Sequence, residues 1–452
     1  MTSERFPAGR STPHPDDSLV ALIDAEVILL AAPNLQGLTL FRSNAVLPVS
    51  SQPDNEVLNR MQDAVIFSGA RTPIGAFLGS LSTLTAPQLG AAAISEAVRR
   101  SGISPDEIDE VIMGCVLTGG VGQAPARQAS LGAGLPNSVP AMTINKVCGS
   151  GMKAVMLAAQ AVKLGDSTIV VAGGMESMSN APYLLDKART GYRMGHAKVI
   201  DSMIHDGLWD PYNDCHMGNC GDSTAKELGF TREQLDEFSA ESYRRALDAQ
   251  RAGRFSDEIV SVEVPQRKGD PLVVSQDEEP SKGNPEKLGS LRPAFARDGV
   301  TTAGNASSIN DGAAALVVST LAEAERRGIQ PLGRIVGYST HAQEPALFTT
   351  APAFAVQNLL QQHGLTVHDI DLFEVNEAFA VVAMAVMQKV EIPHSKINLN
   401  GGAVALGHPI GMTGARLILT ALYELRRRQA RFAIATPCIG GGEATAVLLE
   451  AL

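Results

Sequence analysis

The chain of 452 residues is 44% hydrophobic and 19% charged, and its formal net charge is −11. This length allows about three domains, and the acidic balance argues against nucleic acid or an anionic membrane as the main partner. Five cysteines without regular spacing do not suggest a disulfide framework, so we expect a protein of the reducing cytoplasm. The longest early apolar run, residues 19–32, contains two acidic residues and is too short to span a bilayer, which argues against a signal peptide or a membrane anchor.

Residues 1–61 differ from the rest of the sequence. Proline-rich and serine-rich pieces surround weakly patterned apolar stretches there, a composition that offers too little apolar surface for a core of its own. We expect this segment to be an extension that is either disordered or not native. If the segment is not native, we expect the native chain to start at Met61, which lies directly before a clear strand pattern.

From residue 62 onward, short strand patterns alternate with helical patterns, which is typical of an α/β protein with a mostly parallel sheet. Strands are predicted at residues 63–67, 110–116, 142–147, 167–172, 313–318, 333–338, 371–375 and 430–435. Helices are predicted at residues 86–101, 152–163, 231–251, 322–327 and 351–363, with a last one ending at 428. The 43 glycines and the aromatic content of 4% fit many tight turns between strands and helices.

One of these strand-to-helix turns carries a cysteine. The predicted strand 142–147 ends at Cys148, glycines follow at positions 149 and 151, and a helical pattern begins at 152. Glycines let the backbone bend and let a ligand approach, and a helix N-terminus places unpaired N–H groups beside the sulfur. Both features favour the thiolate, so Cys148 is a candidate nucleophile near neutral pH. A buried structural cysteine is the alternative.

Residues 180–308 lose the regular alternation of strands and helices. We interpret this stretch as an insertion that caps a site, because clustered basic residues in an acidic protein offer docking for an anionic ligand. A solvated loop surface is the alternative interpretation of the same residues. They are Arg267, Lys268, Lys282, Lys287, Arg292 and Arg297.

A similar unit occurs twice in the sequence. In the first half Cys148-Gly-Ser-Gly opens a helix that leads to a strand and to a glycine pair at 173–174. In the second half His408-Pro-Ile-Gly opens a helix that leads to a strand and to three glycines at 440–442. A duplicated βαβ unit brings the carboxyl ends of the central strands, and their reactive residues, to one crevice. We therefore expect an N-terminal half at 62–178 plus 309–330, an inserted loop domain at 179–308 and a C-terminal half at 331–452.

Four motifs in this order carry chemistry: Cys148 with its glycines, Asn376-Glu-Ala-Phe-Ala, Gly407-His-Pro-Ile-Gly and Cys438-Ile-Gly-Gly-Gly. Singly each is weak, since a buried cysteine such as Cys438 is usually inert and His408 before proline also suits a plain turn. Together they resemble the thiolase family, from residue 62 to the end of the chain. The resemblance implies an α/β thiolase fold, in which two similar βαβ-rich halves give a five-layer αβαβα arrangement with an inserted loop domain.

The resemblance also implies a role for each reactive residue. Cys148 attacks the thioester and carries the acyl group, and His408 takes the thiol proton. Cys438 removes a proton from the α-carbon of the second acetyl-CoA, and the enolate is stabilised by His408 with a water held by Asn376. The backbone N–H groups of Cys148 and Gly440 form a second oxyanion hole. No metal or prosthetic group is implied, because coenzyme A is itself substrate and product.

These roles imply an acetyl-CoA C-acetyltransferase, which condenses two acetyl-CoA to acetoacetyl-CoA and CoA or runs the reverse thiolysis. Met217 beside the acyl pocket resembles short-chain members of the family. We expect acyl-CoA and CoA as partners, and a homotetramer or homodimer in which the 180–205 loop is a contact. The residues expected to bind the substrate are Leu208, His216, Met217, Phe295, Ala303, Ser307, Ala378 and Phe379.

Two departures from the family pattern leave other specificities open. Residues 278–291 differ in sequence and charge from the best-known bacterial pattern, and the tail after Ile439 reads Gly-Gly-Gly-Glu where many members have Gln or Met before Gly. One alternative is therefore a 3-ketoacyl-CoA thiolase of longer-chain or 3-oxoadipyl-CoA specificity. A non-catalytic acyl-CoA-binding protein is an alternative of a different class.

Three further alternatives fit the sequence poorly. A zinc site from His205, Cys215, His216 and Cys220 matches no common ligand spacing. A nucleotide-binding module lacks both the Gly-x-Gly-x-x-Gly pattern and a phosphate-loop lysine motif. A ketosynthase pairs one cysteine with two histidines, or with histidine and asparagine, so the second cysteine, Cys438, argues against it.

Overall fold

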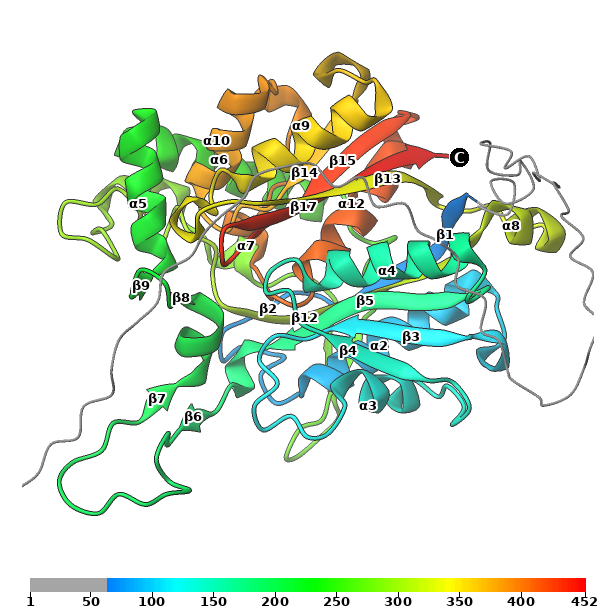
Figure 1. Ribbon diagram of the computed structural model, residues 1–452, viewed down its shortest axis with the longest axis horizontal. Coiled ribbons are helices and arrows are strands. Elements are labelled where there is room, and N and C mark those ends of the chain that lie inside the picture. The colour runs from blue at the N-terminus through cyan, green and yellow to red at the C-terminus, as the bar shows by residue number, and fades with distance from the viewer. Residues whose placement is uncertain (1–62) are drawn as a thin grey trace, which may run out of the picture. The chain divides into compact units, whose positions relative to one another are not determined.

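The structure is a computed structural model that describes residues 63–452 (Figure 1). The expected extension at residues 1–61, and with it the hypothesis that Met61 is the native start, lies outside the described residues. In the part of the chain that is described, the helices are all too short or too polar to cross a bilayer.

A mixed sheet runs through the described chain and consists of two halves. The N-terminal half has the strand order β1-β12-β5-β3-β4, and the C-terminal half has the order β14-β15-β17-β13. The halves join where β1 pairs with β13, over only two residue pairs. The strands are β1 (Ala64–Arg71), β12 (Asn310–Thr320), β5 (Val170–Ser177), β3 (Glu110–Gly114), β4 (Ala141–Ile144), β14 (Leu372–Val375), β15 (Phe432–Thr436), β17 (Glu443–Ala451) and β13 (Gly333–Ala342).

The expectation of a mostly parallel sheet is wrong. The pairs β3/β4, β3/β5 and β14/β15 are parallel, whereas β1/β12, β12/β5, β13/β17 and β15/β17 are antiparallel. The parallel pairs are linked through helical crossovers, as parallel strands require. In contrast, β17 follows β16 (Cys438–Ile439) through the tight turn at 440–442, a connection that reverses the chain.

Helices and half-sheets form the five expected layers (Figure 1). Helices α2 (Ala86–Ser101) and α3 (Pro125–Gly132) cover the outer face of the N-terminal half-sheet, and α9 (Ala351–His363) covers that of the C-terminal half-sheet, with α10 (Ala380–Val390) packed beside it. Helices α4 (Ser150–Leu164) and α12 (Thr413–Arg428) pack against each other between the half-sheets. The expected αβαβα arrangement of two βαβ-rich halves is confirmed.

The central helices are apolar around most of their circumference because both of their sides are covered. Helix α12 is buried from Thr413 to Leu422 without interruption, and even its arginine at 416 is inaccessible to solvent. Helices that are hydrophobic on all sides belong in the middle layer of a large protein. The N-termini of both helices therefore lie in the interior, which is where the reactive residues of the sequence analysis are found.

The insertion after β5 is anchored to the N-terminal half by a buried charge cluster. Arg71 at the end of β1 binds Glu258 and Asp277 of the insertion, each through an N···O distance of 2.7 Å. The regular elements of the insertion are β6 (Tyr183–Leu184), β7 (Ile200–Asp201), a π-helix (Met203–Leu208), β8 (Trp209–Asp210), β9 (Cys215–His216), α5 (Met217–Leu228), α6 (Arg232–Arg251), β10 (Val262–Val264), β11 (Leu272–Val274) and α7 (Glu279–Lys282). Elsewhere the short elements are β2 (Gly75–Ala76), α8 (Leu321–Arg327) and α11 (Ala403–Leu406).

Candidate active site

Cys148 lies in the turn between β4 and α4. Val147, directly before it, adopts a left-handed backbone with a φ of 45°, and α4 begins two residues after the cysteine. A β-branched residue at positive φ is strained, and such strain is concentrated at functional sites. A Cβ at Gly151 would lie 2.9 Å from the carbonyl oxygen of Gly411, in the loop before α12. Only glycine therefore lets the turn approach the C-terminal half so closely.

The Cys148 sulfur is buried and faces two backbone N–H groups, its own and that of Gly440. These donors favour the thiolate, but burial outweighs them and raises the pKa of Cys148 to about 11. The expectation that the turn alone gives a thiolate near neutral pH is therefore wrong. A base must remove the thiol proton.

The imidazole of His408 has a fixed orientation and tautomer. The Thr413 hydroxyl donates to the Pro409 carbonyl oxygen at 2.9 Å, so its oxygen accepts the hydrogen bond from His408 Nδ1, 2.7 Å away. The proton of the neutral ring is thereby held on Nδ1, and Nε2 keeps a free electron pair. Burial, with a smaller effect of the Arg416 charge, lowers the pKa of His408 to about 3. The ring is therefore neutral before the reaction begins.

Cys438 lies at the start of β16 and is buried beside Cys148. Burial raises the pKa of the Cys438 thiol well above its ordinary value, and negative charge on Cys148 raises it further. The charge on one sulfur affects the pKa of the other only when the two sulfurs are neighbours. Ionisation of one thiol therefore opposes ionisation of the other. The loop of His408 reaches the same place, since Ile410 shares a buried apolar cluster with Cys148.

Asn376 follows β14 and reaches His408 from the other side. Its Nδ2 atom lies 3.3 Å from His408 Nε2. Its Oδ1 atom is buried, with no hydrogen-bond partner among residues 63–452. An unpaired buried amide oxygen is costly and is typical of a group kept for a ligand.

Two polar residues that the sequence analysis missed hold these loops in place. Glu176, at the end of β5, accepts hydrogen bonds from the backbone N–H groups of Val116, Leu117 and Gly411 at 3.0 to 3.1 Å. Asn310, at the start of β12, accepts one from the backbone N–H of His408 at 2.8 Å. The signal in the sequence was a polar residue within an apolar strand, but its partners are up to 235 residues away along the chain.

The substrate-binding candidates fall into two contacting groups. His216 stacks on Phe295 with ring centroids 4.5 Å apart, and Phe295 meets Phe379 edge to face at 6.0 Å. Met217 packs against the turn at Gly440. A Cβ added to Gly440 would lie 3.4 Å from the terminal methyl group of Met217. Leu208 packs on the buried cluster that contains Cys148. Aromatic and apolar side chains thus surround the reactive cysteine turn.

A second group is formed by two paired loops. The Ser307 N–H donates to the Ala378 carbonyl oxygen at 3.0 Å, and Ala306 forms a bridge with Phe379. Ala303 lies exposed in the same loop as Ser307. This pairing ties the expected pantetheine-binding loop to the segment that follows Asn376, so both loops have a fixed position relative to the site.

A cavity of about 180 Å³ opens beside the cysteine turn. Its wall includes Val147, Met217, Phe348 and Gly440. The cavity is small and mostly apolar near the reactive turn, so it suits a short acyl chain or a slender thioester arm better than a bulky group.

The clustered basic residues of the insertion lie on the surface, with Lys287, Arg292 and Arg297 all exposed. Their role in docking an anion stays a prediction.

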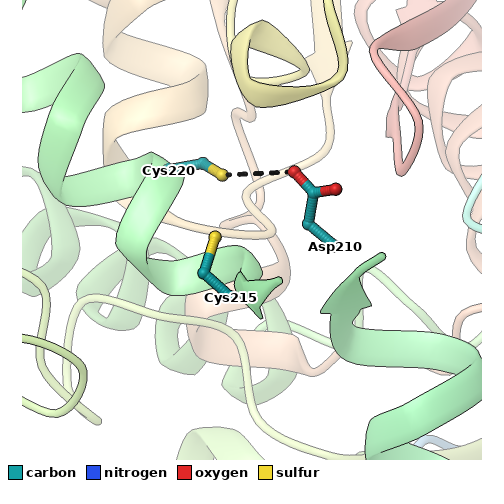
Figure 2. Close-up of side chains that lie close together, drawn as sticks. All are labelled: Asp210, Cys215 and Cys220. Atoms are coloured by element: carbon teal, nitrogen blue, oxygen red, sulfur yellow. Dashed lines mark hydrogen bonds between the residues drawn. The ribbon is translucent and has the colours of Figure 1, made fainter. Parts of the chain in front are cut away.

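Among the four zinc-ligand candidates, the structure brings together only Cys215 and Cys220, and joins them with Asp210 (Figure 2). His216 instead accepts a hydrogen bond from the Gly218 N–H through Nδ1.

Family models match nearly all of the described chain. The model of the thiolase N-terminal domain covers residues 64–322, and the model of the thiolase C-terminal domain covers residues 329–451. The chain belongs to the thiolase family. This confirms the resemblance seen in the four motifs, while the expected boundaries of the two halves and of the loop domain stay predictions.

Many thiolases are similar to this chain over almost their full length. An acetyl-CoA acetyltransferase of Allochromatium vinosum is 52% identical over 390 residues, which are 86% of this chain and 99% of the relative. Acetyl-CoA acetyltransferase 2 of Arabidopsis thaliana is 51% identical over 393 residues, 86% of this chain and 98% of the relative.

Solved thiolase structures share the fold. The Bacillus anthracis acetyl-CoA acetyltransferase superposes with a TM-score of 0.85 at 41% identity, covering 87% of this chain and 99% of that chain. The Acat5 thiolase from Ascaris suum in complex with coenzyme A gives a TM-score of 0.82 at 42% identity, covering 86% and 100%.

Proposed function

We propose that the chain is an acetyl-CoA C-acetyltransferase, which joins two acetyl-CoA into acetoacetyl-CoA and CoA or cleaves acetoacetyl-CoA with CoA. The observation that carries this proposal is that two buried thiols, Cys148 and Cys438, are neighbours, and that the loop of the tautomer-fixed His408 packs with Cys148 through Ile410. Relatives that carry this activity in their names, at about 50% identity, support it. A non-catalytic binding protein has no need for two thiols and a tautomer-fixed base.

The first half-reaction transfers an acetyl group to Cys148. His408 Nε2 takes the thiol proton, and the thiolate adds to the thioester carbonyl. The N–H groups of Cys148 and Gly440, which face the sulfur, stabilise the oxyanion, with about 3 kcal/mol for each donor. The C–S bond to CoA then breaks, and Cys438 gives its proton to the leaving CoA sulfur. The products are acetyl-Cys148, CoA, imidazolium on His408 and thiolate on Cys438.

The second half-reaction forms the carbon–carbon bond. The Cys438 thiolate removes a proton from the α-carbon of a second acetyl-CoA, and the enolate oxygen is stabilised by the Nε2–H of His408 together with Asn376. The enolate carbon attacks acetyl-Cys148, and the Cys148 thiolate leaves and recovers its proton from His408. The enzyme returns to its starting protonation state.

The neighbouring sulfurs impose an order on these two steps. Negative charge on Cys148 opposes ionisation of Cys438, so a free Cys438 thiolate is disfavoured while Cys148 can still ionise. Acetylation turns Cys148 into a neutral thioester and removes that opposition. The carbon-acid step therefore becomes accessible only after the acetyl group is in place.

We extend the proposal to the substrate's position and to the absence of a resident cofactor. Met217 against Gly440 closes the acyl end of the site, while the paired loops at Ser307 and Phe379 flank the pantetheine arm. The exposed basic residues of the insertion suit the phosphates of CoA. The chemistry uses thiol, imidazole and amide groups alone, so CoA is the only organic partner that it requires.

A kinetic comparison tests the chain-length part of the proposal. Acetoacetyl-CoA should be cleaved with a kcat/KM about tenfold or more above that of 3-oxohexanoyl-CoA and 3-oxoadipyl-CoA, because Met217 leaves no room for added methylenes. Higher values for either longer substrate would favour the alternative thiolase specificities. Substituting Met217 by Ala should relax the preference and serves as the matched control.

We also propose that the protein is a cytoplasmic homotetramer or homodimer of fatty acid metabolism. The segment from β6 to β7 supports an assembly, because it exposes several large apolar side chains, a feature of interaction sites. Light scattering of the full chain and of the Met194→Asp variant tests this, and a wild-type monomer would contradict it. The exposed side chains are Tyr183, Leu185, Tyr192, Met194 and Val199.

A further inference from the structure

Outside the catalytic residues, the insertion contains a compact cluster of groups that bind soft metals. Asp210, Cys215 and Cys220 place one carboxylate oxygen and two sulfurs within 4.8 Å of one another (Figure 2). Asp210 and Cys220 are buried, and Cys215 is half-buried. It is the one group of three or more potential ligands that close together within residues 63–452.

The fold determines the position of each of these side chains before any ion binds. Asp210 and Cys215 are cross-strand partners in the β8/β9 hairpin, and Cys220 is in the first turns of α5, which directly follows β9. The hairpin loop is held by hydrogen bonds from the N–H groups of Tyr212 and Asn213 to Asp210 Oδ1 at 2.9 and 3.2 Å. The same carboxylate's Oδ2 points at the Cys220 sulfur, 4.0 Å away.

One of these distances is close to that of a tetrahedral thiolate site, and the ligand atoms of the other pairs lie within 4.8 Å of one another. With bonds of about 2.3 Å to sulfur and 2.1 Å to oxygen, a tetrahedral zinc ion separates its sulfur ligands by about 3.8 Å, and sulfur from oxygen by about 3.6 Å. The observed separation of 4.0 Å between Cys220 Sγ and Asp210 Oδ2 therefore needs a contraction of only a few tenths of an ångström. Three protein ligands leave a fourth position for water.

We propose that Asp210, Cys215 and Cys220 bind a zinc-class divalent ion, which is not a participant in the acyl-transfer reaction. Two thiolates and one carboxylate favour zinc or cadmium over magnesium or calcium. Binding releases the two thiol protons to solvent and forms two metal–sulfur bonds. The ion joins the β8/β9 hairpin to α5 and so fixes His216 and Met217, which lie between the two cysteine ligands along the chain. Met217 also lines the cavity beside the cysteine turn.

Equilibrium dialysis with Zn²⁺ tests the proposal on the full chain, stripped with chelator and kept in a phosphine reductant that prevents disulfides. The chain should bind one Zn²⁺ with high affinity, and Co²⁺ at the same site should give a sulfur-to-cobalt charge-transfer band. The Cys148→Ser/Cys438→Ser double variant should retain this binding, which separates it from metal capture by the catalytic thiols. Cys115→Ser, which removes a buried cysteine outside the cluster, is the matched control and should also retain it.

The Cys215→Ser and Cys220→Ser variants should each lose at least nine-tenths of the bound Zn²⁺ while keeping the circular-dichroism spectrum of the metal-free wild type, which shows that they are folded. If a serine variant does not fold, Asp210→Asn, which removes the carboxylate ligand, should weaken Zn²⁺ binding at least tenfold in a folded chain. In the wild type, Zn²⁺ should slow hydrogen exchange in residues 209–221. Binding that survives Cys215→Ser but disappears in the Cys148→Ser/Cys438→Ser variant, or no binding to the wild type, would overturn the proposal.

Discussion

The two central helices begin in ways that suit opposite tasks. In the N-terminal half α4 begins two residues after Cys148, so backbone N–H groups point at the sulfur. In the C-terminal half α12 begins five residues after His408, and the imidazole is held by side-chain bonds to Thr413 and Asn376 instead. One copy of the duplicated unit thus presents N–H donors that stabilise negative charge, and the other presents an imidazole nitrogen that can accept a proton.

The contact between the two turns explains why both need glycine. A Cβ at Gly414 would lie 2.5 Å from the backbone nitrogen of Met152, and one at Gly151 would lie 2.9 Å from the carbonyl oxygen of Gly411. The two helix N-termini therefore touch through their backbones. This proximity brings together the helix N-termini that follow Cys148 and His408, although 260 positions, counted from 148 to 408, separate the two residues in the sequence.

The largest expected effect separates the two thiols. The Cys438→Ser variant should still form acetyl-enzyme but lose condensation by about 10³-fold or more, because serine is a far weaker base toward the α-carbon. Intact-mass measurement of the acetyl-enzyme, together with the rate of acetoacetyl-CoA formation, checks both parts. If acetylation disappeared as well, the division of labour between the sulfurs would be wrong.

Removing the base should change the pH dependence of acetylation. The His408→Asn variant should acetylate about 10²- to 10³-fold more slowly at pH 7. Because burial raises the pKa of Cys148 to about 11, the thiolate fraction then grows about tenfold for each pH unit below that value. Rapid-quench rates should therefore rise steeply from pH 7 to 9 in the variant. A flat profile would show that His408 is not the acceptor of the thiol proton.

Loss of the hydroxyl that orients the imidazole should have a moderate effect. The Thr413→Val variant leaves the Nδ1–H of His408 without its acceptor and lets the ring adopt the other tautomer, so kcat should fall about tenfold with a small change in KM. The matched control is Thr420→Val, a buried threonine of the same helix that bonds Glu258. Equal losses of kcat in both variants would point to packing rather than to orientation of the ring.

The smallest effect on the chemistry is expected at Glu176, whose role shows in stability. Burial raises the pKa of Glu176 from 4.5 to about 7, so the folded state holds this proton more tightly than the unfolded chain does. Its stabilising contribution is complete below about pH 4.5 and is lost as the pH rises through 7, about 3 kcal/mol in all. The unfolding free energy of Glu176→Gln should lack this component, whereas the exposed Glu391→Gln should keep it. Identical pH profiles for Glu176→Gln and the wild type would contradict this account.

The candidate reactive residues could be named from the sequence because each lies in a short local pattern, and their roles stay predictions. Cys148 and Cys438 both precede glycines at the end of an apolar run, and His408 follows a glycine. The antiparallel return of β17 was not predictable in this way, because strand pairing depends on the direction of distant segments. The residues that support the site, Glu176 and Asn310, were missed for the same reason.

The pKa of the nucleophile was misjudged for a physical reason as well. A helix N-terminus is visible in the sequence after Cys148, and it stabilises a thiolate. The depth of burial is not visible there, and it is the stronger effect. The need for a separate base emerges only from the folded chain.

Peptide mapping after brief incubation with acetyl-CoA tests the central claim most directly. In the wild type and in Cys438→Ser, the acetyl group should be found on the peptide that carries Cys148, and Cys148→Ser should carry none at position 148 or 438. An acetyl group on Cys438, or normal acetylation of the Cys148→Ser chain, would contradict the assignment of the nucleophile.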